Sequence, residues 1–317
     1  MEIVIIDSGY KSYAFEKELF EKNGFSLKIN PDFKGDPSEK RDFAKNADGI
    51  LVRHTIIDEI FLSEMINLKA VVRYGVGYDN IDIEACTRHG VKVANVQGYA
   101  NHAVSDHAIA LMLSCTRAMW NTEFQLQEGF ASPPVPDIIE LHDKIIGIIG
   151  IGRIGSIFCK KATPFFRQVL ACDPYKPDSH FNQLSVQRVD LDELLERSDV
   201  ISLHCNLTDE TKHLLRREKF SLMTKKPVIV NTSRGEVISE EALLDALNTG
   251  KIHSAGLDVF EDEPLTDKQS SLVDHPRTIC TGHYAWYSDK SMFELQRRAA
   301  NNLLNFLKGN AVDDCLN

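Results

Sequence analysis

Residues 144–155 have the sequence Lys-Ile-Ile-Gly-Ile-Ile-Gly-Ile-Gly-Arg-Ile-Gly. The apolar run 145–149 is typical of a buried parallel strand, and it leads directly into a GxGxxG motif. Gly150 permits a tight turn, Gly152 lets a pyrophosphate approach the backbone, and Gly155 allows a helix to pack closely on the strand. GxGxxG alone is a weak signal. Because a helical pattern follows it, the stretch predicts a dinucleotide-binding turn between strand and helix.

The next expected strand ends at Asp173, 18 residues after Gly155. A carboxylate at this point accepts hydrogen bonds from the adenosine ribose hydroxyls and repels a 2′-phosphate. The sequence therefore favours NAD over NADP, although Lys176 nearby would weaken that preference.

Short β-branched runs alternate with amphipathic segments along the whole chain, which predicts mostly parallel sheets covered by helices. Strands are expected at Ile3–Ile6, Phe25–Ile29, Gly49–Val52, Ala70–Arg73, Val91–Ala94, Ile145–Ile149, Val169–Cys172, Val200–His204, Val228–Asn231, Ser254–Leu257 and Thr278–Cys280. Helices are expected near Lys11–Lys22, Asp58–Met65, Ile83–His89, Asn101–Asn121 and Ser288–Lys308. A proline-rich break at 132–136 follows the long fourth helix. The fold class is thus α/β, with two doubly wound parallel-sheet domains.

Length and composition fit this prediction. The chain has 317 residues, enough for two domains, with 43% hydrophobic and 26% charged residues. Its net charge of −10 argues against nucleic acid as a main partner. No apolar run reaches membrane-spanning length, and an acidic residue near the N-terminus argues against a signal peptide, so we expect a cytoplasmic protein. The seven scattered cysteines are expected to be thiols.

Three further motifs directly follow or end expected strands. They are Asn-Thr-Ser-Arg-Gly at 231–235, Gly-Leu-Asp-Val-Phe-Glu-Asp-Glu-Pro at 256–264 and Gly-His-Tyr-Ala-Trp at 282–286. Because parallel strands share one carboxyl edge, a guanidinium, a carboxylate and an imidazole are expected to meet there. An imidazolium can protonate a developing alkoxide, a neighbouring carboxylate raises its pKa, and an arginine can grip a substrate carboxylate. These groups suit the reduction of a 2-keto acid.

The motifs resemble those of the D-2-hydroxyacid dehydrogenase family, which includes D-lactate, glycerate, hydroxypyruvate and 3-phosphoglycerate dehydrogenases. Residues 73–82, Arg-Tyr-Gly-Val-Gly-Tyr-Asp-Asn-Ile-Asp, resemble its substrate-domain signature, and residues 104–107 resemble the start of its interdomain helix. The resemblance covers essentially the whole chain. It implies that His283 is the acid/base, Glu263 its partner and Arg234 the substrate-orienting arginine.

The resemblance also implies the binding residues. The cofactor-binding set is Gly150, Gly152, Arg153, Ile154, Gly155, Asp173, Thr232 and Asp258, the last holding the nicotinamide carboxamide. The substrate-binding set is Arg53, Arg73, Val76, Gly77 and Trp286, in which the backbone of Val76 and Gly77 binds the substrate carboxylate. Arg53 and Arg73 either bind a second anion on the substrate or pair with surface acids. Trp286 either walls the pocket or packs at a hinge.

The family's architecture implies a flavodoxin-like substrate domain at 1–100, to which 286–317 returns, and a Rossmann NAD domain at 101–285. A cleft between them would close on substrate. The family commonly forms homodimers around the long helix. Its apolar residues Met112, Leu113, Met119 and Trp120 are either candidate dimer contacts or part of the core.

Two alternatives stay open. Residues 283–288 resemble the branch that includes the C-terminal-binding-protein corepressors, so an NAD(H)-sensing interaction protein is one alternative. A phosphite-type dehydrogenase is the other, whereas Glu263 argues against a formate type, which pairs its histidine with glutamine. Gly282 stands where the family usually has proline, so the shape of the local loop is open.

The ten other histidines show no ligand spacing, so no metal site is predicted. We interpret them as structural or exposed.

Overall fold

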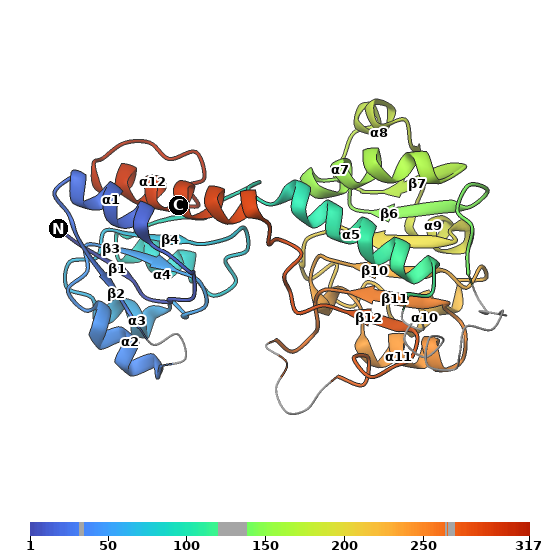
Figure 1. Cartoon of the computed structure of the whole chain (residues 1–317), viewed down its shortest axis with the longest axis horizontal. Coiled ribbons are helices and arrows are strands. Elements are labelled where there is room, and N and C mark those ends of the chain that lie inside the picture. The colour runs from blue at the N-terminus through green and yellow to red at the C-terminus, as the bar shows by residue number, and fades with distance from the viewer. Residues whose placement is uncertain (32–34, 120–137, 264, 266–269) are drawn as a thin grey trace. The chain divides into compact units, whose positions relative to one another are not determined.

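The computed structural model describes residues 1–31, 35–119, 138–263, 265 and 270–317. The chain forms two compact units, Met1–Tyr99 with Ser288–Asn317, and Ala100–Tyr287 (Figure 1). Within the described residues, no helix is both long and apolar enough to cross a membrane. The expected proline-rich break at 132–136 lies outside the described residues.

The first unit is built on a parallel sheet whose described strands follow the order β2-β1-β3-β4-β5, the flavodoxin-like order. Its strands are β1 (Glu2–Ile5), β2 (Ser26–Ile29), β3 (Gly49–Val52), β4 (Ala70–Arg73) and β5 (Lys92–Ala94). Its helices are α1 (Ala14–Lys22), α2 (Pro37–Ala44), α3 (Glu59–Ser63), α4 (Ile83–Arg88) and α12 (Asp289–Leu307). The expected flavodoxin-like parallel sheet is therefore confirmed.

Helix α12 carries the end of the chain back to this sheet, where it lies beside α1 and against β3 and β4 (Figure 1). A reciprocal cap starts it: the Ser291 N–H donates to the Ser288 hydroxyl at 3.1 Å, and the Ser288 N–H donates to the Ser291 hydroxyl at 2.8 Å. Leu295 and Leu303 on its inner face are buried. The expected helix at 288–308 is confirmed.

The second unit holds a larger parallel sheet, whose described strands follow the order β12-β11-β10-β9-β6-β7-β8. Its strands are β6 (Ile145–Ile149), β7 (Gln168–Cys172), β8 (Gln187–Arg188), β9 (Val200–Leu203), β10 (Val228–Asn231), β11 (Ser254–Leu257) and β12 (Thr278–Cys280). Its helices include α5 (Asn101–Thr116), α7 (Arg153–Ala162), α8 (Asp178–Leu184), α9 (Leu191–Arg197), α10 (Arg217–Ser221) and α11 (Glu240–Asn248). The strand order reverses between β6 and β9, the position where such sheets bind ligands.

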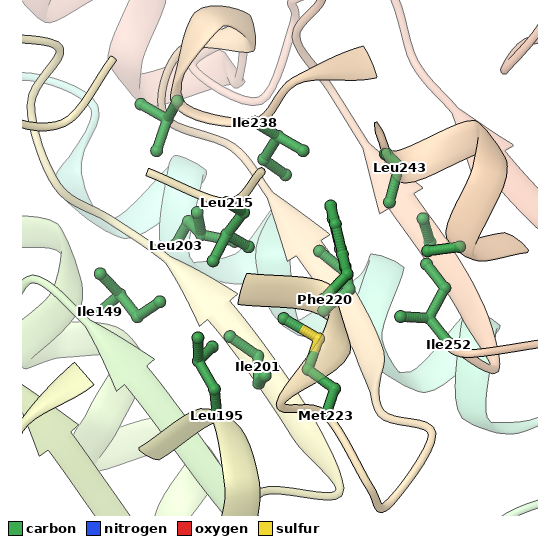
Figure 2. Close-up of a cluster of buried hydrophobic side chains, with 14 of the residues drawn as sticks. Ile149, Leu195, Ile201, Leu203, Leu215, Phe220, Met223, Ile238, Leu243 and Ile252 are labelled. Atoms are coloured by element: carbon green, nitrogen blue, oxygen red, sulfur yellow. The ribbon is translucent and has the colours of Figure 1, made fainter. Parts of the chain in front are cut away.

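Apolar side chains cover both faces of this sheet. On one face α5 lies across β10 and β11 (Figure 1). On the other, a cluster that includes Leu203, Phe220 and Met223 fills the space beneath the covering helices (Figure 2).

Helix α5 ends at Thr116, earlier than the expected Asn121. Met112 is fully buried, which decides for the core alternative at this residue, and Leu113 packs partly buried against the same core. Met119 is exposed, and Trp120 lies outside the described residues.

Candidate active site

The glycine turn after β6 has the geometry that its sequence predicts. Gly150 has a φ of +86°, and a Cβ placed on it would lie 2.7 Å from the backbone N of Cys205. A Cβ on Gly155 would lie 2.0 Å from the Gly150 carbonyl oxygen, so helix and strand need glycine to pack this closely. A Cβ on Gly152 would meet nothing within 4 Å. Space is therefore open at the one glycine where a ligand is expected.

Asp173 lies just past the end of β7 and faces this turn. Its Oδ2 accepts the N–H of Ile151 at 3.0 Å, and its Oδ1 accepts the N–H of Tyr175 at 3.0 Å. Arg153 and Ile154 form the first turn of α7, where backbone N–H groups have no preceding helical carbonyl to bind.

Thr232, directly after β10, adds a second sign of a ligand. Its side chain is buried, and its hydroxyl has no hydrogen-bond partner within the described residues. A buried hydroxyl without a partner costs free energy that a polar ligand can recover. Together with the open Gly152 turn and the placed Asp173 carboxylate, these residues fit a dinucleotide cofactor.

Glu263 and His283 form a direct pair in the second unit. His283 Nδ1 bonds Glu263 Oε2, and Glu263 Oε1 accepts the N–H of Phe260 at 2.8 Å. Burial alone would raise the pKa of the Glu263 carboxyl, but the His283 hydrogen bond and charge lower it below its ordinary value. The Phe260 N–H and the charge of Arg234 act in the same direction. The carboxylate is thus held ionised beside the imidazole.

Arg234 approaches this pair because its backbone packs against the second motif. Asn231 closes the turn after β10, donating from its side-chain amide to the Arg234 carbonyl at 2.9 Å. A Cβ on the next residue, Gly235, would lie 1.9 Å from the carbonyl carbon of Phe260. Arg234 Nη1 donates to the Ser233 carbonyl at 2.8 Å. The Arg234 charge acts on the Glu263 carboxyl, and Glu263 bonds His283, so the three predicted catalytic side chains lie in one region of the second unit.

Asp258 is buried at the end of β11, and the segment 281–285 wraps around it. Its Oδ1 accepts the Thr281 hydroxyl at 2.5 Å and the Tyr284 N–H at 3.1 Å, and its Oδ2 accepts the Ala285 N–H at 2.9 Å. The Asp258 carbonyl accepts the N–H of His283 at 2.8 Å. These are the hydrogen bonds that shape the segment carrying His283.

His283 itself has a φ of +53°, a conformation that a residue with a side chain rarely adopts. Trp286 supports it, donating from its indole N–H to the His283 carbonyl at 2.9 Å. Gly282 has no positive φ, and a Cβ there would meet nothing within 4 Å. The glycine at this position is therefore not required by the backbone.

In the first unit, Arg53 follows β3 at the sheet's carboxyl edge. The buried carboxylate of Asp7, just past β1, accepts the N–H groups of Arg53, His54 and Thr55 at 2.9, 2.8 and 2.9 Å. The Arg53 guanidinium stacks 4.6 Å from the centre of the Tyr10 ring. Asp7 therefore holds the backbone of Arg53, and Tyr10 holds its side chain.

Arg73 ends the neighbouring strand β4. A Cβ on Gly75 would lie 1.8 Å from Arg73 Nη1, so glycine makes room for the guanidinium over the loop. The loop is fixed by Asn95, which donates to the Val76 carbonyl at 2.6 Å. The N–H groups of Val76 and Gly77 donate to no acceptor among the described residues. This loop therefore presents two backbone donors beside a guanidinium.

Sequence reasoning missed two residues that shape these sites, Asp7 and His107. Asp7 directly follows an apolar strand run, which is a usable signal for a functional position. His107 is one of the histidines expected to be structural or exposed. It is structural, because its Nε2 bonds the Thr281 hydroxyl at 2.9 Å and lies 3.6 Å from Asp258 Oδ1, and no sequence signal indicates these partners.

Comparison with known proteins identifies relatives over both units. Residues 109–285 match the family described as D-isomer specific 2-hydroxyacid dehydrogenase, NAD binding domain. A hydroxypyruvate reductase of Thermotoga maritima is 40% identical over 75% of this chain and 76% of its own length. A D-3-phosphoglycerate dehydrogenase of Methanocaldococcus jannaschii is 35% identical over 86% of this chain but 52% of its own, so the chain spans about half of that relative. A D-lactate dehydrogenase from Aquifex aeolicus, solved with NAD and lactic acid, superposes with a TM-score of 0.86 at 30% identity, covering 98% of this chain and 96% of that one.

Proposed function

Because the chain belongs to the D-isomer specific 2-hydroxyacid dehydrogenase family and is an NAD-dependent enzyme, we propose that it interconverts a small D-2-hydroxy acid and its 2-keto acid. His283 is the acid/base, Glu263 its partner and Arg234 the substrate-orienting residue. The hydrogen bond between His283 and Glu263, in reach of the Arg234 charge, is the observation that carries the proposal.

The second unit supplies the groups for proton transfer. NAD, when bound at the glycine turn, would supply the hydride for reduction and accept it in oxidation. The imidazole of His283 gives a proton to the carbonyl oxygen in reduction and takes it back in oxidation, through Nε2, because Nδ1 is bound to Glu263. Glu263, which is held ionised, fixes the orientation of the imidazole through its bond to Nδ1. The Arg234 fork binds the substrate carboxylate and polarises the carbonyl.

The first unit supplies further groups that can donate hydrogen bonds to an anion. It is proposed as the substrate domain. The N–H groups of Val76 and Gly77 suit a carboxylate, which accepts backbone donors well. Arg53 directly follows β3 and Arg73 ends the neighbouring strand β4, so both are positioned for a second anion such as a phosphate or carboxylate.

A screen of NADH oxidation tests the proposed function. The panel is glyoxylate, pyruvate, hydroxypyruvate, 2-ketoglutarate, bulkier 2-keto acids and 3-phosphohydroxypyruvate. We expect turnover on at least one of them. Tight NADH binding without any turnover would instead support the sensing protein, and NAD reduction by phosphite would support the phosphite type.

Replacing Arg53 by alanine is expected to lower kcat/KM on the best substrate by about 10- to 100-fold, the value of one or two charge-assisted hydrogen bonds. Arg88→Ala is the matched control, because Arg88 is an exposed arginine of the same unit that pairs with Glu59 at 2.9 Å. If Arg53→Ala equals wild type, the second-anion site is wrong.

The Asp173 carboxylate is expected to make the enzyme prefer NADH over NADPH by about 10- to 100-fold, because it repels the 2′-phosphate at short range. Asp173→Asn should narrow the ratio of kcat/KM values for the two cofactors. Equal use of NADPH by the wild-type enzyme would contradict the role given to Asp173.

A further inference from the structure

We propose that His107 is a positioning residue for His283 and acts on it through Thr281 and Asp258. The inference rests on the proposed function, because it takes His283 as the acid/base. It adds a residue from helix α5, far away in the sequence, to the parts that set the catalytic geometry.

The hydrogen bonds form a directed chain. The Thr281 hydroxyl donates its single proton to Asp258 Oδ1 at 2.5 Å, so it must accept from His107 Nε2 at 2.9 Å. His107 therefore carries its proton on Nε2. The Asp258 carboxylate at the end of this chain also binds the N–H groups of Tyr284 and Ala285. In the sequence, His283 lies between Thr281 and Tyr284, so Asp258 holds the chain on both sides of it.

The neutral imidazole suits this role. Burial lowers the pKa of His107 below its ordinary value, although the nearby charge of Asp258 raises it. The groups that face the ring are Asp258 from the end of β11, and Thr281 and Tyr284 from the segment after β12, where the Tyr284 ring lies edge-on at 5.2 Å. A neutral ring donates a hydrogen bond to Thr281 and does not form an ion pair with Asp258. The Asp258 carboxylate therefore stays available to the Tyr284 and Ala285 N–H groups.

His107 lies on a helix that is fixed in the core, and it contacts the segment 281–285, which carries His283. Its neighbours Ala108, Leu111 and Met112 on α5 are buried in the core, which fixes the helix. His283 is exposed and has a positive φ, and such a backbone conformation persists only where surrounding contacts hold it. Without the His107 donor, the Thr281 hydroxyl can rotate away from Asp258, and the segment loses one of its ties.

The first test separates positioning from packing by kinetics. His107→Phe keeps a planar ring without the donor, and we expect kcat to fall about 10- to 100-fold while KM for the 2-keto acid changes less than about 2-fold. His107→Gln, which keeps an N–H donor, should recover most of the loss. His102→Gln, an exposed histidine of the same helix, is the matched control and should equal wild type. A His107→Phe enzyme with wild-type kcat, or a Gln variant as slow as the Phe variant, would overturn the inference.

A double-mutant cycle tests the route. If His107 acts through Thr281, then Thr281→Val should lower kcat to a similar degree, and the double variant with His107→Phe should be no slower than the slower single variant. Additive losses would mean that His107 acts by another path.

Hydrogen exchange gives a readout that does not need turnover. In His107→Phe, amides of residues 282–287 should exchange about tenfold faster than in wild type or His102→Gln, while residues 145–149 stay unchanged. If exchange at 282–287 is unaltered, the inference fails even where the enzyme is active. If exchange rises but no keto acid is turned over, the proposed function fails instead.

Discussion

Replacing His283 by alanine is expected to lower kcat by about 10²- to 10⁴-fold, the usual contribution of a positioned general acid/base. The imidazole is the proton donor to the carbonyl oxygen in the proposed mechanism. The Glu263 carboxyl beside it is held ionised, so it cannot supply this proton in place of His283. The initial rate of NADH oxidation at saturating substrate measures the loss. NADH binding, followed by its fluorescence, should change little.

The chain offers a matched control for this substitution. His142 of the same unit also bonds a carboxylate, with its Nδ1 3.2 Å from Glu140 Oε1, but that pair is exposed and lies outside the catalytic cluster. His142→Ala should therefore keep wild-type turnover. If His283→Ala turns substrate over at a wild-type rate, the acid/base assignment is wrong.

Replacing Asp7 by alanine is expected to lower the free energy of unfolding of the first unit by about 3–5 kcal/mol, because it removes the carboxylate that compensates the buried charge of Lys40. Lys40 Nζ lies 2.8 Å from Asp7 Oδ1, and both side chains are buried. The Thr55 hydroxyl, 2.6 Å from the same oxygen, and the backbone donors of 53–55 also lose their acceptor. Urea denaturation followed by circular dichroism measures the change.

A second substitution and a surface pair serve as controls for Asp7. Adding Lys40→Met to Asp7→Ala should recover part of the loss, because the buried lysine charge is then removed as well. The pair of Lys69 and Asp48 has the same 2.8 Å separation but an exposed lysine, so Lys69→Ala should cost less than about 1 kcal/mol. A loss below that value in Asp7→Ala would contradict the expectation.

The same carboxylate gives a pH dependence with a definite sign. Burial would raise the pKa of Asp7, but hydrogen bonds from Lys40, Thr55 and His54 lower it from 3.8 to about 2. Because the folded-state pKa is the lower one, this stabilisation is present above pH 3.8 and is lost as the pH falls through about 2. The shift corresponds to about 2 kcal/mol at neutral pH.

The strands and the glycine turn could be predicted because their signals are local. Residues 145–149, 228–231 and 278–280 form strands with the predicted bounds, since short apolar runs next to turn residues leave few other conformations. Strand β8 was missed because it has only two residues, both exposed, and so carries no apolar pattern. Helix α2 was missed because its buried side includes Lys40, a residue type that the pattern assigns to solvent.

The motifs also located the candidate site on carboxyl ends of strands, because parallel strands place those ends at one edge. What no local pattern contains is which polar group faces which. Asp7 meets residues 53–55, and His107 meets Thr281 across 174 positions of sequence. A polar residue within an apolar pattern looks the same whether its neighbour is water or a buried carboxylate. Packing brings the partner to it, and burial then removes water and makes the hydrogen bond decisive.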